Sequence, residues 1–128
     1  MITPAKYVVV GVDDDFRVRE SIESLVESAG YAASVFSSAE EFLESGNLPG
    51  AICVVTDVRM PGMDGIELQR SIRLQRPKLP VIFISAHQDD ETLTRALEGG
   101  AVRFLYKPFD GAELLRVIEA ALNEAPED

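Results

Sequence analysis

The residues best suited to chemistry stand at the ends of apolar runs. An acidic run, residues 13–15, follows the first apolar run, and Asp57 ends the run AICVVTD. Ser85 ends another apolar run, and Lys107 follows the last one. Because chemistry in an open parallel sheet gathers beyond the carboxyl ends of the strands, we expect these side chains to converge on one edge of a sheet.

Carboxylates that lie a few ångströms apart cannot all ionise without compensation. They can retain protons through raised pKa values, or they can bind a hard divalent cation. Mg²⁺ prefers one or two carboxylates together with carbonyl oxygens and water molecules. A site rich in acids, without His or Cys nearby, therefore favours Mg²⁺ or Mn²⁺ over Zn²⁺.

Lys107 and Ser85 give this expected site a second character. An ammonium group, a hydroxyl and Mg²⁺ together would bind a phosphoryl group, whose oxygens need positive charge and hydrogen-bond donors. A carboxylate can attack phosphorus and form an aspartyl phosphate. Asp57 has the central place on the expected edge, between Asp13–Asp14 and Ser85, and is the best-placed nucleophile. The plainer alternative is that Lys107 only balances the charge of the acids.

The elements that must position these residues alternate between strand and helix. Apolar, β-branched runs predict strands, and apolar residues at helical spacing predict amphipathic helices. Nearly continuous apolar strands separated by such helices indicate a parallel sheet covered on both faces. We expect an α/β, doubly wound sheet of five strands with five helices. If the first and third strands are neighbours, as in the flavodoxin-like order 2-1-3-4-5, the acids share a pocket. The predicted strands are 7–13, 32–37, 51–57, 80–85 and 102–106.

The helix boundaries carry signals of their own. Gly30 is placed to end the first helix. A capping residue followed three positions later by Glu predicts the start of three further helices. Asp89 or Asp90 is expected to cap the fourth helix, whose apolar residues are Leu93, Ala96 and Leu97. The capping pairs are Ser38 with Glu41, Asp64 with Glu67, and Asp110 with Glu113.

Composition sets the broad class. The 128 residues fit one domain, 1–128, with a core of about 7–123 and residues 124–128 as a tail or the start of a linker. The 46% hydrophobic content excludes wholesale disorder, and the net charge of −10 disfavours nucleic acid and anionic lipid as partners. Cys53 is expected in the core. With no signal peptide and no run of roughly 20 apolar residues, we expect a cytoplasmic protein.

From about Tyr7 to Asn123, the sequence resembles the receiver domain of bacterial two-component response regulators. The resemblance rests on VDDD after the first strand, TDVRMPGMDG around Asp57, ISA at Ser85 and KPF at Lys107. The segments SAEEFL, VTDVRMPGMDG and RFLYKPF look most like the nitrogen-fixation (FixJ-like) regulator branch. In that branch the receiver usually precedes a helix-turn-helix DNA-binding domain.

The resemblance implies roles for the residues of the acidic edge. Asp57 would accept a phosphoryl group from a sensor histidine kinase. Asp14 and Asp57 would bind Mg²⁺ with the backbone carbonyl of Arg59, and Asp13 would act through a metal-bound water. Lys107 would pair with the aspartyl carboxylate and then with the phosphoryl oxygens.

The resemblance also implies a switch. Ser85 would turn its hydroxyl onto the phosphoryl group, and it stands where many members have Thr. Phe104 would be the aromatic residue whose rotamer follows activation, although it lacks the hydroxyl of the Tyr that many members carry. The bond between Lys107 and Pro108 is expected to be cis. In the family the positions of Arg59 and His87 tune dephosphorylation, but we assign His87 no catalytic role.

The leading interpretation is a phosphorylation-activated signalling switch, not an enzyme beyond self-catalysed phosphorylation and dephosphorylation. Its output face would be the fourth helix, fifth strand and fifth helix, used to form a phosphorylation-dependent homodimer and to control transcription through a DNA-binding domain. The domain itself would contact neither nucleic acid nor membrane. One alternative is a small Mg²⁺-dependent phosphohydrolase with an Asp nucleophile, although such enzymes usually carry a second acid where Arg59 stands. Another is a nucleotide or flavin binder, which would need a phosphate loop in place of DDDF.

Overall fold

The computed structural model describes residues 7–86, 90–100 and 103–124. Within these residues, five parallel strands form one sheet in the predicted order β2-β1-β3-β4-β5. The strands are β1 (Val8–Val12), β2 (Ala32–Phe36), β3 (Ala51–Asp57), β4 (Val81–Ser85) and β5 (Arg103–Tyr106). The helices are α1 (Phe16–Ser28), α2 (Ala39–Glu44), α3 (Gly65–Gln75), α4 (Asp90–Glu98) and α5 (Gly111–Glu124).

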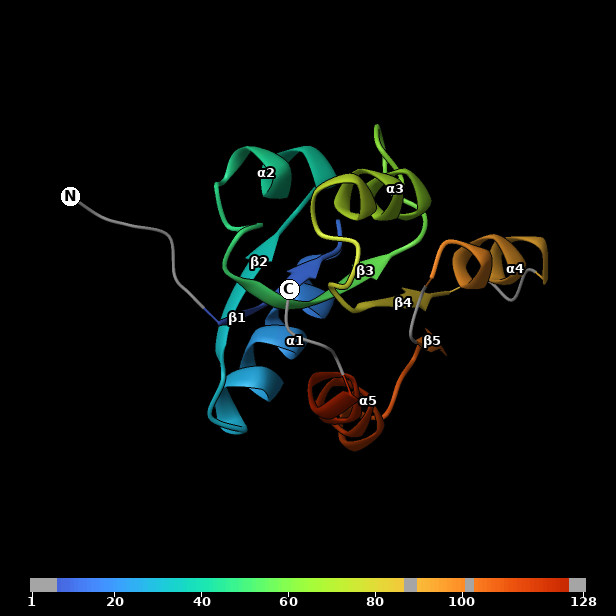
Figure 1. Cartoon of the computed structure of the whole chain (residues 1–128). Coiled ribbons are helices and arrows are strands. Elements are labelled where there is room, and N and C mark those ends of the chain that lie inside the picture. The colour runs from blue at the N-terminus through green and yellow to red at the C-terminus, as the bar shows by residue number, and fades with distance from the viewer. Residues whose placement is uncertain (1–6, 87–89, 101–102, 125–128) are drawn as a thin grey trace.

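Helices cover both faces of the sheet (Figure 1). On one face, Ile22 of α1 and Ile118 of α5 belong to a single buried cluster. On the other, Phe42 of α2, Leu68 of α3 and Ala96 of α4 belong to a second cluster. β1 and β3 lie inside the sheet and are almost wholly buried, which explains their continuous apolar sequences. β2, at the edge, is only partly buried, as its weaker apolar character predicted.

The register of the strands aligns their polar ends. Val12 of β1 pairs with Thr56 of β3, so Asp13 and Asp57 follow at the same level on adjacent strands. On the other side of β3, Asp57 pairs with the residue before Ser85. The acidic run, the acceptor candidate and the hydroxyl therefore share the carboxyl edge of the sheet, as predicted.

Two of the predicted capping pairs make hydrogen bonds at the starts of their helices. Asp64 caps α3 with the predicted capping box, accepting a 2.8 Å hydrogen bond from the N–H of Glu67, whose carboxylate accepts one of 3.0 Å from the N–H of Asp64. Ser38 caps α2 and accepts a hydrogen bond from the N–H of Glu41. The carboxylate of Glu41 accepts from the N–H of Ser37, one residue before the cap.

The starts of two predicted strands were wrong by one residue, and one predicted core residue was found to be exposed. Tyr7 was placed in the first strand, but its φ of 60° lies in the left-handed region, which a strand does not contain. Pro80 was placed at the start of the fourth strand, but it has no N–H for the ladder, and β4 starts at Val81. Leu97 was placed on the apolar side of its helix, but it is 51% exposed, whereas Ala96 is buried.

Several predicted features fall on residues that the structure does not describe. These are the cap at Asp89, the start of the last strand at Val102, His87, and the tail from residue 125. The helix that Asp89 or Asp90 was expected to cap begins at Asp90. In the described part of the chain, no helix combines the length and apolarity needed to cross a bilayer.

Candidate functional site

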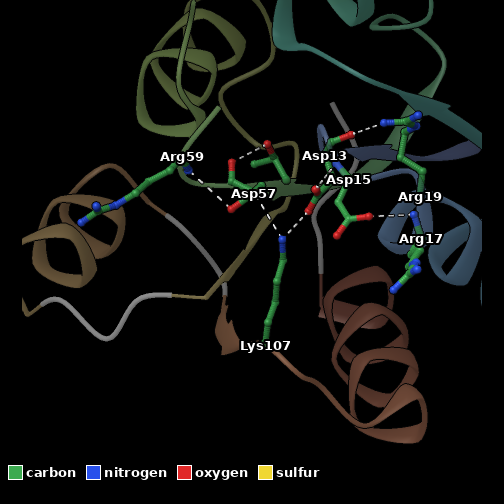
Figure 2. Close-up of polar contacts among 8 residues, drawn as sticks. Asp13, Asp15, Arg17, Arg19, Asp57, Arg59 and Lys107 are labelled. Atoms are coloured by element: carbon green, nitrogen blue, oxygen red, sulfur yellow. Dashed lines mark hydrogen bonds and ion pairs between the residues drawn. The ribbon is translucent and has the colours of Figure 1, made fainter. Parts of the chain in front are cut away.

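An acidic cluster lies where β1 and β3 end side by side. One carboxylate oxygen from each of Asp13, Asp14 and Asp57 lies within 4.8 Å of the others. Asp13 is fully buried, Asp57 is nearly so, and Asp14 is exposed. Figure 2 shows the ammonium group of Lys107 reaching toward the carboxylates of Asp13 and Asp57. The structure thus brings together the acids that the sequence singled out.

Lys107 directly follows β5 and extends across the end of the sheet. Its Nζ lies 2.8 Å from Oδ2 of Asp13 and donates a 3.2 Å hydrogen bond to Oδ2 of Asp57. Its backbone N–H donates a 2.7 Å hydrogen bond to the carbonyl of Ser85, which continues the pairing of β4 with β5 and fixes the start of the side chain. The bond from Lys107 to Pro108 is cis.

The two charges of this ion pair are stabilised unequally. Burial raises the pKa of Asp13, and the opposing interactions with Lys107 and the N–H of Asp15 do not cancel that effect. Burial alone would lower the pKa of Lys107, but its interactions with Asp13 and Asp57 outweigh burial and raise it. The lysine is therefore held protonated, whereas the charge on Asp13 is only partly compensated.

The carboxylate of Asp13 is the most buried part of the acidic cluster. One oxygen of this carboxylate, Oδ1, accepts a 2.8 Å hydrogen bond from the N–H of Asp15. Oδ2 is fully buried, and its partner among the described residues is Nζ of Lys107 at 2.8 Å. Burial still raises the pKa of Asp13 in spite of this ion pair, so a further cation would stabilise its charge. Together with the carboxylates of Asp14 and Asp57, the Asp13 carboxylate forms an all-oxygen set that fits Mg²⁺.

The loop after β1 is fixed by Asp15, which the sequence analysis named only as part of the acidic run, and by Arg19, which it did not select. The carboxylate of Asp15 caps α1 and accepts a 2.9 Å hydrogen bond from the N–H of Arg17. Arg19, one turn into α1, donates a 2.8 Å hydrogen bond to the backbone carbonyl of Asp13 (Figure 2). Asp is a preferred N-cap residue, so the sequence carried a signal for Asp15. It carried none for Arg19, whose contact depends on how α1 leaves the sheet.

Hydrogen bonds from Thr56 and from the loop after β3 fix the position of Asp57. The hydroxyl of Thr56 donates a 2.9 Å hydrogen bond to the carbonyl of Asp57, and the N–H of Arg59 donates a long one of 3.4 Å to Oδ1. The N–H of Gly65 donates a 2.8 Å hydrogen bond to the carbonyl of Val58. A Cβ on Gly65 would overlap the carbonyl of Asp57. Glycine at this position therefore permits α3 to begin directly against the acceptor candidate.

The two expected switch residues lie on neighbouring strands. Ser85 is buried at the end of β4 and pairs with Tyr106. Phe104 is half-buried two residues earlier on β5 and pairs with Phe83. Its ring centroid is 6.0 Å from that of Phe83 and 5.2 Å from that of Tyr106. Phe104 and Tyr106 thus share one side of the sheet, next to the strand that ends in Ser85.

An open pocket lies beside Lys107. It lies between α1 and the segments that follow β4 and β5. The side chain of Lys107 is 19% exposed, so the lysine side of the site is accessible. The pocket is lined by Arg17, Val18, Ser21, Ala86, Lys107, Pro108 and Phe109.

Comparisons with known proteins identify the family. Residues 9–119 match the family described as response regulator receiver domain. Over 120 residues the chain is 43% identical to the response regulator protein TodT of Pseudomonas putida, covering 94% of this chain and 53% of TodT. Over 116 residues it is 41% identical to the transcriptional regulatory protein FixJ of Bradyrhizobium diazoefficiens, covering 89% of this chain and 56% of FixJ. The crystal structure of FixJ-N matches with a TM-score of 0.82 at 34% identity, covering 97% of this chain and 99% of that one.

These matches decide between the functions considered from the sequence. The chain spans about half the length of the curated relatives, 53% of TodT and 56% of FixJ. The FixJ-like resemblance is confirmed. A phosphohydrolase is not favoured, because the matched family is a signalling one and Arg59 stands where such enzymes usually carry an acid. The chain belongs to the response regulator receiver domain family.

Proposed function

We propose that a sensor histidine kinase phosphorylates Asp57 and that the modification controls transcription through a further domain of the protein. The observation that carries the proposal is the position of Asp57 at the end of β3, with Nζ of Lys107 3.2 Å from its Oδ2. The relative FixJ, described as a transcriptional regulatory protein, supports the choice of output.

In the proposed transfer, an oxygen of Asp57 bonds to phosphorus while the P–N bond of a phosphohistidine breaks. The imidazole nitrogen keeps the electron pair of that bond and takes up a proton. Lys107 neutralises the attacking carboxylate first and the phosphoryl oxygens afterwards. Asp14, Asp57 and the backbone carbonyl of Arg59 would hold Mg²⁺, and Asp13 would act through a water. When bound, Mg²⁺ supplies positive charge to the phosphoryl oxygens.

A small acyl phosphate serves as a donor in the same way. Asp57 takes the phosphoryl group as the bond between phosphorus and the acyl oxygen breaks, and the carboxylate leaving group carries away the electron pair. The side chains of Lys107 and Asp57 are 19% and 10% exposed, which supports access for a small donor. The proposal therefore includes self-catalysed phosphorylation without a kinase.

The phosphoryl group then biases a two-state equilibrium. It adds about −1.5 to −2 charges and three strong acceptor oxygens. Ser85 follows it with its hydroxyl, and Phe104 moves into the space that is vacated. A nearly complete shift between states requires about 5.5 kcal/mol of differential interaction. Charge-assisted hydrogen bonds of about 1.5–3 kcal/mol each, from Ser85, Lys107 and backbone N–H groups, supply much of this.

The proposed output face consists of α4, β5 and α5. It carries the exposed side chains of Arg95, Arg103 and Arg116 among acidic residues. Leu97, 51% exposed, adds an apolar contact surface on α4. Mixed charges around an apolar residue suit a reversible homodimer better than a permanent one.

The acceptor assignment is tested with acetyl phosphate or beryllofluoride in the presence of Mg²⁺. The chain has three Tyr and no Trp, so its ultraviolet fluorescence is that of tyrosine, and Tyr106 lies beside Phe104. The wild type should show a saturable change in fluorescence that Asp57→Asn abolishes. Asp110→Asn, which removes a carboxylate that caps α5, is the control and should retain the response.

Two results would contradict the proposal. One is an Asp57→Asn variant that still responds to beryllofluoride, which would place the acceptor elsewhere. The other is steady turnover of many phosphomonoesters by the wild type, which would favour a hydrolase over a switch.

A further inference from the structure

Glu40 makes a contact outside its own helix that helix formation does not require. Oε2 of Glu40, in the first turn of α2, accepts a 3.1 Å hydrogen bond from the backbone N–H of Met63. Met63 belongs to the loop between β3 and α3, residues 58–64, which also contains Arg59. The contact therefore joins α2 to the loop that follows Asp57.

The start of α2 is complete without Glu40. Ser38 caps the N–H of Glu41, and the carboxylate of Glu41 caps the N–H of Ser37. Of the two acids in the first turn, Glu40 and Glu41, only Glu41 takes part in these two capping hydrogen bonds. Glu40 is therefore available for a contact outside its own helix.

Gly62 is matched to this contact in two ways. Its φ of 76° lies in the left-handed region that favours glycine. A Cβ at this position would lie 2.5 Å from Oε2 of Glu40. The glycine thus lets the chain turn and lets the carboxylate of Glu40 approach the loop. A turn alone would account for the first property but not for the second.

The loop is thereby held at two points. At its base, the N–H of Gly65 donates a 2.8 Å hydrogen bond to the carbonyl of Val58. At its outer part, Glu40 holds the N–H of Met63. Arg59 lies between these two points, and its N–H reaches Oδ1 of Asp57 only at 3.4 Å. The segment that carries the carbonyl of Arg59 is thus bounded by a hydrogen bond at Val58 and another at Met63.

We propose that Glu40 is a positioning residue for the Mg²⁺ and phosphoryl site, acting through the backbone of the 58–64 loop. This role rests on the proposed function, in which the carbonyl of Arg59 is a metal ligand. The cluster of carboxylates within 4.8 Å of one another comprises Asp13, Asp14 and Asp57. Glu40 is not a member, so it acts on the loop and not as a ligand.

The test compares two substitutions of Glu40 with a matched control on the same helix. Glu40→Ala removes the acceptor, Glu40→Gln removes the charge but keeps an acceptor oxygen, and Glu44→Ala removes an exposed charge on α2. Mg²⁺ affinity is measured by calorimetry, and hydrogen exchange of the Met63 N–H is measured by NMR without metal. Glu40→Ala should weaken Mg²⁺ binding about fivefold, as expected for one net hydrogen bond, and should speed exchange at Met63.

Glu40→Gln and Glu44→Ala should both bind Mg²⁺ as the wild type does. The positioning role fails if Glu40→Ala binds Mg²⁺ normally, or if Glu40→Gln loses as much affinity as Glu40→Ala, since charge would then be responsible. A merely structural role would lower the thermal unfolding midpoint without changing Mg²⁺ affinity. If Glu40→Ala does not fold, Glu40→Asp, one methylene shorter, should show the same loss of affinity.

The two proposals can fail separately. A wild type that binds neither Mg²⁺ nor beryllofluoride would contradict the proposed function, and the positioning role would fall with it. A wild type that binds both, beside a Glu40→Ala variant with unchanged Mg²⁺ affinity, would contradict the positioning role alone.

Discussion

The carboxylate of Asp13 and the ammonium group of Lys107 lie 2.8 Å apart, with Asp13 fully buried and the side chain of Lys107 19% exposed. Burial raises the pKa of Asp13 in spite of this partner. The acids around Lys107 raise its pKa in spite of burial. The folded protein without metal therefore stabilises the cation of this pair better than the anion, and the first two predictions follow from that difference.

Asp13→Asn should stabilise the metal-free protein. The pKa of Asp13 is higher in the folded state than in the unfolded state, where it is 3.8. The free energy of unfolding of the protein therefore falls as the pH rises above 3.8. At neutral pH the neutral amide should therefore raise the free energy of unfolding. The gain should shrink as the pH falls toward 3.8. Urea unfolding in the presence of a chelator measures both effects.

Asp14→Asn is the matched control for this prediction, because Asp14 belongs to the same cluster but is exposed. It should change the stability of the metal-free protein much less. An Asp13→Asn variant that is less stable than the wild type at neutral pH without metal would show that the ion pair outweighs the burial of Asp13.

Lys107→Ala should fold but should separate phosphorylation from dimerisation. A raised lysine pKa adds stability below the unfolded value of 10.5, and that stability is lost as the pH rises through the folded value. Removing the charge should lower the free energy of unfolding by about 1.5–3 kcal/mol at neutral pH, the usual contribution of a hydrogen bond to a charged group. Sedimentation before and after treatment with acetyl phosphate measures the loss of coupling.

Lys78→Ala, which removes an exposed lysine after α3, provides the comparison for Lys107→Ala. It should dimerise on phosphorylation as the wild type does. Normal phosphorylation-dependent dimerisation of Lys107→Ala would refute the role given to the lysine.

The thiol of Cys53 should be inert in the folded protein. Cys53 is fully buried, and burial raises the pKa of its thiol from 9.0 to about 12. Because the thiolate is the reactive form, a thiol reagent should label the native protein more than about a hundredfold more slowly than the urea-unfolded protein. Between pH 9.0 and about 12 the unfolded state releases a proton that the folded state keeps.

This proton difference lowers the free energy of unfolding by about 1.4 kcal/mol per pH unit in that range. Cys53→Ala has no thiol to titrate, so its stability should fall less steeply at alkaline pH. The same alkaline slope in both proteins would show that Cys53 is not the group responsible.

Gly99→Ala should destabilise the protein through one neighbouring side chain. Gln69 of α3 is buried and donates a 3.0 Å hydrogen bond from Nε2 to the carbonyl of Ala96 in α4. A Cβ on Gly99 would overlap Oε1 of Gln69. Overpacking of this kind costs about 1–3 kcal/mol. The cost should be smaller in a Gln69→Ala background, where the opposing atom is absent.

A double-mutant cycle by urea unfolding measures this coupling. Effects of Gly99→Ala and Gln69→Ala that add within about 0.5 kcal/mol would contradict direct contact, since residues that share no interaction are additive at that level.

Much of this protein followed from the sequence by itself. Alternating strand and helix periods predicted the order of elements and the parallel sheet, and the polar strand ends predicted which edge would carry Asp13, Asp57, Ser85 and Lys107. The Asp64–Glu67 capping box was also predicted correctly. Such features depend on residues close together in the chain, or on the simple rule that the ends of parallel strands meet at one edge.

Tertiary structure alone decided the contacts that tune the site. It placed Lys107 nearer to Asp13 than to Asp57, and it joined Glu40 to Met63 across 23 residues of sequence. It also exposed Leu97, which the helical period had placed inside. No short-range pattern specifies such contacts, because each depends on the distance and angle between elements packed from separate parts of the chain. Periodicity predicts which face of an element is apolar, but only packing decides how far that face is covered.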